Sequence, residues 1–123
     1  MSEPVIDIGV LERVGAAAAQ FAPGERIFVQ DDGGDCMYVV RSGRVSIKAG
    51  GMVLENIEAN GVFGEMSLID GSPRSATAVA EEPTEVLPID RAAFHELVRH
   101  DPEFALRLMR LLAGRIRRTN ESL

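Results

Sequence analysis

Short apolar segments separated by glycine-rich turns fill the chain from about residue 18 to about residue 90. Residues 44–48 alternate apolar and polar side chains, which indicates a strand with one buried face. The clusters at 31–35 and 50–51 are rich in Gly and Asp and are typical of turns. The segments predicted to be strands are 26–29, 36–41, 44–48, 52–57, 76–80 and 84–89. Many short strands with frequent turns favour a β-sandwich or a β-barrel.

Helical patterns flank this β region. Apolar side chains within residues 5–20 are compatible with one or two short helices. Asp90 is a suitable N-cap for a helix that begins after the last strand. The run 101–103 then combines a capping Asp, a proline at the first helical position and an acid in the first turn. We therefore expect two C-terminal helices over about residues 91–121.

The composition is that of a soluble globular protein. The chain of 123 residues, 46% hydrophobic and 26% charged, fits a single domain that spans residues 1–123. No apolar run approaches the roughly 20 residues that a membrane-spanning helix needs. The acidic start at residues 1–4 lacks the basic region of a signal peptide. We expect a cytoplasmic protein that does not bind a membrane.

Charge and residue counts argue against several kinds of site. The net charge of −6 is unfavourable for a nucleic-acid binder. The basic cluster at 115–118 is explained by the preference of cations for a helix C-terminus. Cys36 is the only cysteine, and we expect it to be a small apolar filler on a strand. His95 and His100 do not form a zinc motif, so we expect neither a metal site nor a cupin-type metalloenzyme.

Residues 63–78, with the sequence FGEMSLIDGSPRSATA, are suited to holding a small anion. Gly64 has no Cβ, so the backbone can approach a ligand closely. Residues 65–68 can start a helical turn whose free N–H groups point at whatever precedes it. A turn at 71–73 brings the chain back to Arg74, whose planar fork matches phosphate oxygens. Glu65 can accept hydrogen bonds from sugar hydroxyls.

This stretch resembles the phosphate-binding cassette of cyclic nucleotide-binding domains, as in protein kinase A regulatory subunits and the catabolite activator protein family. Residues 21–28 and 34–45 resemble the opening strand and central hairpin of the same family. The resemblance covers about residues 21–120 and implies a jelly-roll β-barrel at about 18–90, with an N-terminal helical segment and two C-terminal helices. Asp31 stands where the family often has Gly, which we expect to affect only a distal turn.

The resemblance also implies a role for each residue of the pocket. Arg74 would hold the equatorial phosphate oxygen, Glu65 would bind the ribose 2′-hydroxyl, and backbone N–H groups would complete the cradle. In the catabolite activator family the last helix covers the base, where its Thr contacts adenine and the next Ser reaches over from the other subunit. The run 113–120 is similar to that helix. The expected ligand-binding residues are Phe63, Gly64, Glu65, Met66, Ser67, Arg74, Ser75, Ala76, Thr119 and Asn120.

The last helix carries two apolar stripes. One stripe, which we expect to pack against the barrel, contains Phe104, Leu108, Leu111 and Leu112. The other has a/d spacing and contains Leu106, Met109, Ala113, Ile116, Asn120 and Leu123. Because a helix that is apolar on two sides needs two neighbours, we expect a parallel homodimer through the second stripe. Burial of the whole helix inside a monomer is the alternative.

We therefore expect a receptor for a cyclic nucleotide that is not an enzyme and has no catalytic residue or cofactor. The sequence favours cAMP over cGMP because Thr119 suits adenine, although Ser75 could contact the amino group of guanine. Ligand binding would move the last helix and signal to an effector protein that the sequence does not identify. Only three residues follow Asn120, so we expect no recognition helix and no DNA binding. The alternatives are a dimerisation module of the same fold that binds no nucleotide, and the remnant of a transcription regulator.

Overall fold

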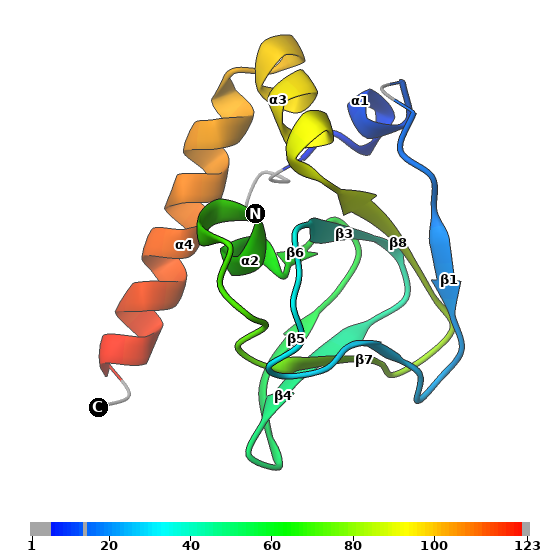
Figure 1. Cartoon of the computed structure of the whole chain (residues 1–123), viewed down its shortest axis with the longest axis vertical. Helices are drawn as coiled ribbons and strands as arrows, with labels where there is room; N and C mark the ends of the chain where they lie inside the picture. Colours follow the sequence, from blue (N-terminus) through cyan, green and yellow to red (C-terminus); the bar gives the residue numbers. More distant parts are fainter. Residues whose placement is uncertain (1–5, 14, 122–123) are drawn as a thin grey trace.

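The computed structural model describes residues 6–13 and 15–121, and it describes side chains as far as Arg118. Within these residues the chain forms eight strands and four helices (Figure 1). The elements are α1 (Ile8–Arg13), β1 (Ala19–Phe21), β2 (Arg26–Phe28), β3 (Met37–Ser42), β4 (Val45–Ala49), β5 (Met52–Ile57), β6 (Val62–Phe63), α2 (Glu65–Asp70), β7 (Thr77–Ala80), β8 (Thr84–Ile89), α3 (Arg91–His100) and α4 (Glu103–Glu121).

The strands form two antiparallel sheets with the crossed connections of a jelly roll. One sheet has the order β1-β8-β3-β6 and the other has the order β2-β7-β4-β5. Consecutive strands therefore alternate between the sheets at several points, which confirms the predicted jelly-roll fold. Strand β5 lies at the edge of its sheet, on the side along which α4 runs (Figure 1).

Two apolar clusters fill the molecule, and the alternation of side chains along β3 divides its residues between them. Met37 and Val39 point toward the helices, whereas Val40 points between the sheets. Strand β6 does the same with Val62 and Phe63, one residue for each cluster. Because β3 is covered on both faces, its sequence is almost continuously apolar. The barrel is therefore packed inside while its first sheet also supports the helices.

The strands at Met52–Ile57 and Thr84–Ile89 have the predicted bounds, and those predicted at 26–29, 36–41, 44–48 and 76–80 differ by one residue at one or both ends. Two strands were not predicted. Strand β1 begins at the last of four consecutive alanines, a run without strand-like alternation, and β6 is only two residues long. The N-terminal helical prediction is confirmed by α1, although residues 1–5 and 14 lie outside the described part of the chain.

The C-terminal helices confirm the predicted start signals. The carboxylate of Asp90 accepts a hydrogen bond from Ala93 N at 2.8 Å, which caps α3. Helix α4 begins at Glu103, directly after the predicted Asp-Pro pair. Phe104 and Leu108 are buried in the cluster beneath α4, so the stripe predicted to face the barrel does so. His95 and His100 are exposed on α3, as expected of surface groups.

Candidate functional site

The predicted anion-binding stretch forms a tight cassette between β6 and β7. Gly64 has φ 75°, a left-handed conformation that favours glycine, and α2 begins at the next residue. Gly71, with φ 71°, ends α2 and donates its N–H to the carbonyl of Ser67 at 3.0 Å. The predicted helical turn is therefore confirmed, and it is bounded by two left-handed glycines that return the chain to Arg74.

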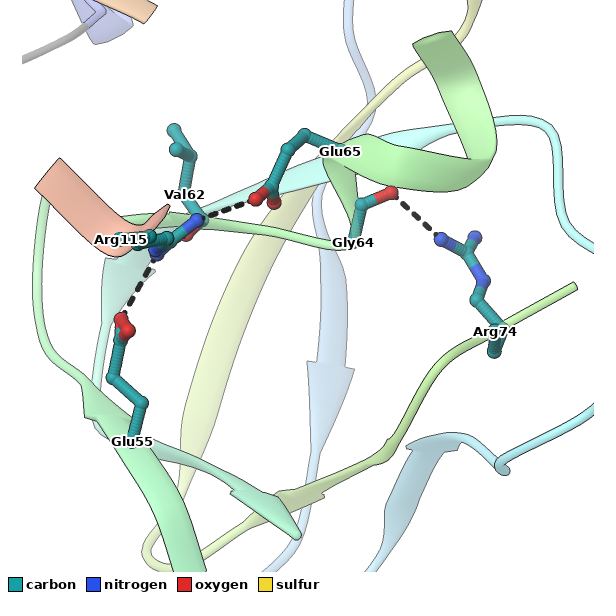
Figure 2. Close-up of polar contacts among 6 residues, drawn as sticks. All are labelled: Glu55, Val62, Gly64, Glu65, Arg74 and Arg115. Atoms are coloured by element: carbon teal, nitrogen blue, oxygen red, sulfur yellow. Dashed lines mark hydrogen bonds and ion pairs between the residues drawn. The ribbon is translucent and has the colours of Figure 1, made fainter. Parts of the chain in front are cut away.

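Arg74 lies against Gly64, with only 4% of the residue exposed. Its Nη1 donates to Gly64 O at 2.8 Å (Figure 2), and its Nη2 donates to Cys36 O at 2.9 Å. Its Cζ lies 4.2 Å from the centroid of the Phe28 ring. The Nε atom is buried and has no hydrogen-bond partner among the described residues. One N–H group of the guanidinium is thus left without an acceptor in a desolvated position.

An aromatic cluster packs against one face of the Arg74 guanidinium. Phe28 on β2 lies 5.9 Å from Phe63 on β6 and 6.0 Å from Tyr38 on β3, between ring centroids. Tyr38 and Phe63 stack at 5.2 Å. Burial raises the pKa of Tyr38 to about 12, with a further contribution from Cys36. Phe63, predicted as a ligand-binding residue, is 1% exposed and belongs to this support.

The 31–35 turn holds the backbone of Arg74. Asp31 N donates to Arg74 O, and Arg74 N donates to Asp32 O, both at 2.8 Å. The expectation that Asp31 affects only a distal turn is wrong, because this turn pairs directly with the cassette. Asp31 has φ 74°, the conformation for which glycine is the usual residue. A Cβ on Gly34 would lie 2.3 Å from Arg74 Nε, so this turn also packs against the guanidinium.

Cys36 was expected to be an apolar filler on a strand, and this is wrong. It lies just before β3, and its carbonyl is one of the two that hold Arg74. Its Sγ lies 3.8 Å from Arg74 Nη2. Cys36 therefore contributes mainly through its backbone carbonyl, which accepts a hydrogen bond from Arg74. The residue type alone could not predict this contact.

Glu65 begins α2 and is 6% exposed, and its carboxylate is engaged by α4. Arg115 Nη1 donates to Glu65 Oε1 at 2.6 Å (Figure 2). Arg115 Nη2 donates to Glu55 Oε2 at 3.0 Å and to Val62 O at 2.8 Å. Burial alone would lower the pKa of Arg115, but Glu65 and Glu55 outweigh it and raise the pKa above its usual value. Arg115 therefore stays charged and ties α4 to α2, β6 and β5.

The interpretation of Arg115 as one of several cations at a helix end is thus wrong. Its role depends on the docking of α4 onto the barrel, and Glu55 was also missed because nothing in β5 marks it as facing α4. One signal was available, since Arg115 occupies the Arg position of the helix motif that carries the base-contacting Thr.

The remaining predicted site residues differ in their surroundings. Ser67 and Ala76 are buried, whereas Met66 and Ser75 are exposed. Thr119 and Asn120 lie in the last turn of α4, and their side chains are outside the described part of the structure. The structure therefore places Arg74 against Gly64 and the Glu65 carboxylate against Arg115, and it leaves the predicted base contacts untested.

Two surface cavities are present away from the cassette. One, of about 510 Å³, lies between residues 6–9, Asn60 and the start of α4, and the other, of about 490 Å³, lies beside β1. Neither is lined by Glu65 or Arg74. Within residues 6–13 and 15–121, the structure shows no cluster of His, Cys, Asp and Glu arranged for a metal ion. Nor is any helix in that part long and apolar enough to cross a membrane.

Comparison with known proteins supports the interpretation of residues 63–78 as a phosphate-binding cassette. Residues 18–101 match the family model described as cyclic nucleotide-binding domain. The Cyclic AMP receptor protein of Thermus thermophilus is 41% identical over 102 residues, which cover 79% of this chain and 47% of that protein. The cAMP-dependent protein kinase regulatory subunit of Yarrowia lipolytica is 36% identical over 75 residues, 61% of this chain and 20% of that protein.

A solved structure agrees as well. The catabolite activator protein of Thermus thermophilus superposes with a TM-score of 0.81 at 36% identity, over 94% of this chain and 55% of that one. The chain spans about half the length of the curated relative from Thermus. The matched residues include β1 to β8 and the cassette with Glu65 and Arg74. The chain belongs to the cyclic nucleotide-binding domain family.

Proposed function

We propose that this chain is a cyclic nucleotide receptor in which Arg74 binds the phosphate and Glu65 binds the ribose 2′-hydroxyl. The proposal depends on the surroundings of the Arg74 guanidinium. Its Nε–H is buried without an acceptor, and the guanidinium has no carboxylate partner among the described residues. A buried donor without a partner costs about 1–3 kcal/mol. An anionic phosphate would satisfy both the donor and the charge.

The proposed contacts are sufficient in magnitude. Charge-assisted hydrogen bonds contribute about 1.5–3 kcal/mol each, and a micromolar affinity needs about 8 kcal/mol. Two or three such bonds from Arg74 and Glu65, with burial of the base, reach that value. Backbone N–H groups around Gly64, Met66, Ser75 and Ala76 would add to the phosphate cradle.

We favour cAMP over cGMP as the ligand. Thr119 occupies the position in α4 from which an adenine contact is expected, and both curated relatives named above are named for cAMP. Ser75 is exposed beside Arg74, where it could meet the amino group of guanine. The same relatives are a receptor and a regulatory subunit, so we propose a regulatory role without catalysis.

Isothermal titration calorimetry with cAMP, cGMP and 5′-AMP tests the proposal. We expect cAMP to bind at micromolar concentration or below, cGMP more weakly, and 5′-AMP weakest because its dianionic, uncyclised phosphate does not fit the same cradle. Absence of binding by both cyclic nucleotides would contradict the receptor function, whereas tighter binding of cGMP would contradict only the choice of base.

Signalling would pass through α4. The ion pair between Arg115 and Glu65 fixes α4 over the cassette, so a ligand that contacts Glu65 changes what holds the helix. A ligand shifts an equilibrium only if it binds one arrangement better than another. We propose that cyclic nucleotide binding redistributes α4 and thereby alters a dimer or the surface offered to an effector protein.

The outer stripe of α4 supports a homodimer. Leu106, Met109 and Ile116 are 42%, 62% and 62% exposed, and Ala113 between them is partly buried. Ile116→Glu would place a charge in this stripe and should convert a dimer to a monomer in sedimentation velocity, with Arg117→Glu as the control for added charge. A wild-type chain that is monomeric at high concentration would contradict the homodimer. A dimer that binds neither cyclic nucleotide would instead support the alternative of a dimerisation module.

A further inference from the structure

Both terminal nitrogens of Arg115 donate hydrogen bonds to other elements of the fold. Nη1 donates to Glu65, whereas Nη2 donates to both Glu55 and Val62 O (Figure 2). Because the two nitrogens are separate corners of one planar group, the bonds of Nη2 can persist while the bond of Nη1 opens. Arg115 can therefore lose Glu65 and still be held to β5 and β6.

The two carboxylates around Arg115 differ in exposure. The side chain of Glu65 is 8% exposed, that of Glu55 is 34% exposed, and that of Arg115 lies between them at 20%. A guanidinium this far from water is costly without a counter-charge. If Glu65 were its only acidic partner, any ligand that took Glu65 would leave Arg115 uncompensated. Glu55 supplies a second negative charge on the same guanidinium.

We infer that Glu55 is a positioning residue that retains Arg115 and so frees Glu65 for the sugar of the ligand. The inference rests on the proposed function, in which Glu65 accepts a hydrogen bond from the ribose 2′-hydroxyl. Without Glu55, Arg115 loses a carboxylate that compensates its charge, so the sugar must compete with a stronger ion pair between Arg115 and Glu65. Glu55 thus affects recognition of the 2′-hydroxyl without touching the ligand.

The chemistry of the ligand separates this role from a general effect on the fold. 2′-Deoxy-cAMP lacks the hydroxyl that Glu65 would bind but keeps the phosphate and the base. For the wild-type chain we expect calorimetry to show a preference for cAMP over 2′-deoxy-cAMP of about tenfold or more, the size of one charge-assisted hydrogen bond. Glu55→Gln should reduce this preference at least threefold, with most of the loss in the affinity for cAMP.

Three further variants complete the test. Glu58→Gln removes an exposed glutamate just after β5 and should leave the preference unchanged. Glu55→Asp keeps the charge and should restore part of the preference. In an Arg115→Leu background, where Glu65 has no guanidinium to leave, Glu55→Gln should have no effect on the preference. Thermal melts establish that each variant is folded at the temperature of the titration.

The possible results are distinguishable. If the wild-type chain binds neither ligand, the proposed function fails. If the wild-type chain prefers cAMP and Glu55→Gln keeps the full preference, Glu55 has no positioning role and the inference is overturned. An equal effect of Glu55→Gln with and without Arg115 would also overturn it. If Glu55→Gln does not fold, Glu55→Asp decides, because its shorter side chain should lower the preference measurably.

Discussion

Two arginines lie on either side of the cassette, and they differ in what holds them. Arg74 is held by two carbonyl oxygens and an aromatic ring. Arg115 is held by two carboxylates and a carbonyl. Carbonyls and rings orient a guanidinium without cancelling its charge, whereas carboxylates cancel it. Arg74 is therefore suited to binding an anion and Arg115 is suited to joining elements of the fold.

The largest expected effect comes from removing the charge-compensated arginine. Loss of one partner from a buried ion pair costs about 3–5 kcal/mol. Because the side chain of Arg115 keeps 20% exposure, we expect Arg115→Leu to lower the free energy of unfolding by roughly 2–3 kcal/mol. Urea denaturation measures it, with exposed Arg99→Leu as the control. Equal stability of the two variants would contradict the role of Arg115 as a tie.

The second effect concerns ligand affinity. Arg74→Leu removes the proposed phosphate ligand and should weaken cAMP binding at least tenfold, about 1.4 kcal/mol. The barrel should remain folded, because the removed cation had no counter-charge among the described residues. Calorimetry together with a thermal melt checks both statements. Unchanged affinity in a folded Arg74→Leu protein would refute the assignment of Arg74 to the phosphate.

A smaller effect is expected from the ring beneath Arg74. A desolvated cation–π contact contributes about 2 kcal/mol, part of which an aliphatic side chain replaces by packing. We expect Phe28→Leu to weaken cAMP binding about fivefold, or about 1 kcal/mol. Phe28→Tyr retains the ring and serves as the matched control in the same titrations. If both variants bind equally well, the ring does not orient Arg74.

The last effect, which appears only at alkaline pH, is a change in stability. The pKa of Tyr38 is raised from 10.0 to about 12, because burial disfavours the phenolate. Between these pH values the phenol of the unfolded chain loses its proton while that of the folded chain keeps it. The contribution of Tyr38 to the free energy of unfolding is therefore fully present below pH 10 and is lost as the pH rises through about 12. Tyr38→Phe should remove this part of the decline. Tyr38 is the only tyrosine, so phenolate absorbance reports its titration directly; an apparent pKa near 10 would contradict the shift.

The sequence could predict those parts of the fold and site that depend on local patterns. The alternation at residues 44–48 predicted β4, the Asp90 cap predicted α3, and the glycines around α2 predicted the cassette. These features depend on residues within a few positions of one another.

The parts that were missed depend on contacts between distant segments. Arg115 and Glu55 lie sixty residues apart in the sequence and meet only because α4 docks beside β5. The 31–35 turn supports Arg74 through backbone atoms, which no residue pattern records. Strand β6 is too short for a periodic signal, and its two residues pack into different apolar clusters.

The central claim is that the buried Nε–H of Arg74, which has no acceptor among the described residues, donates a hydrogen bond to the phosphate of the ligand. Titration of ¹⁵N-labelled protein with cAMP, followed at the arginine Nε–H resonances, tests it directly, with the Arg74 signal assigned by its absence in Arg74→Leu. We predict a large downfield shift of this resonance with cAMP and none with adenosine, which lacks the phosphate. An Arg74 signal that does not move with cAMP, or that moves equally with adenosine, would contradict the account.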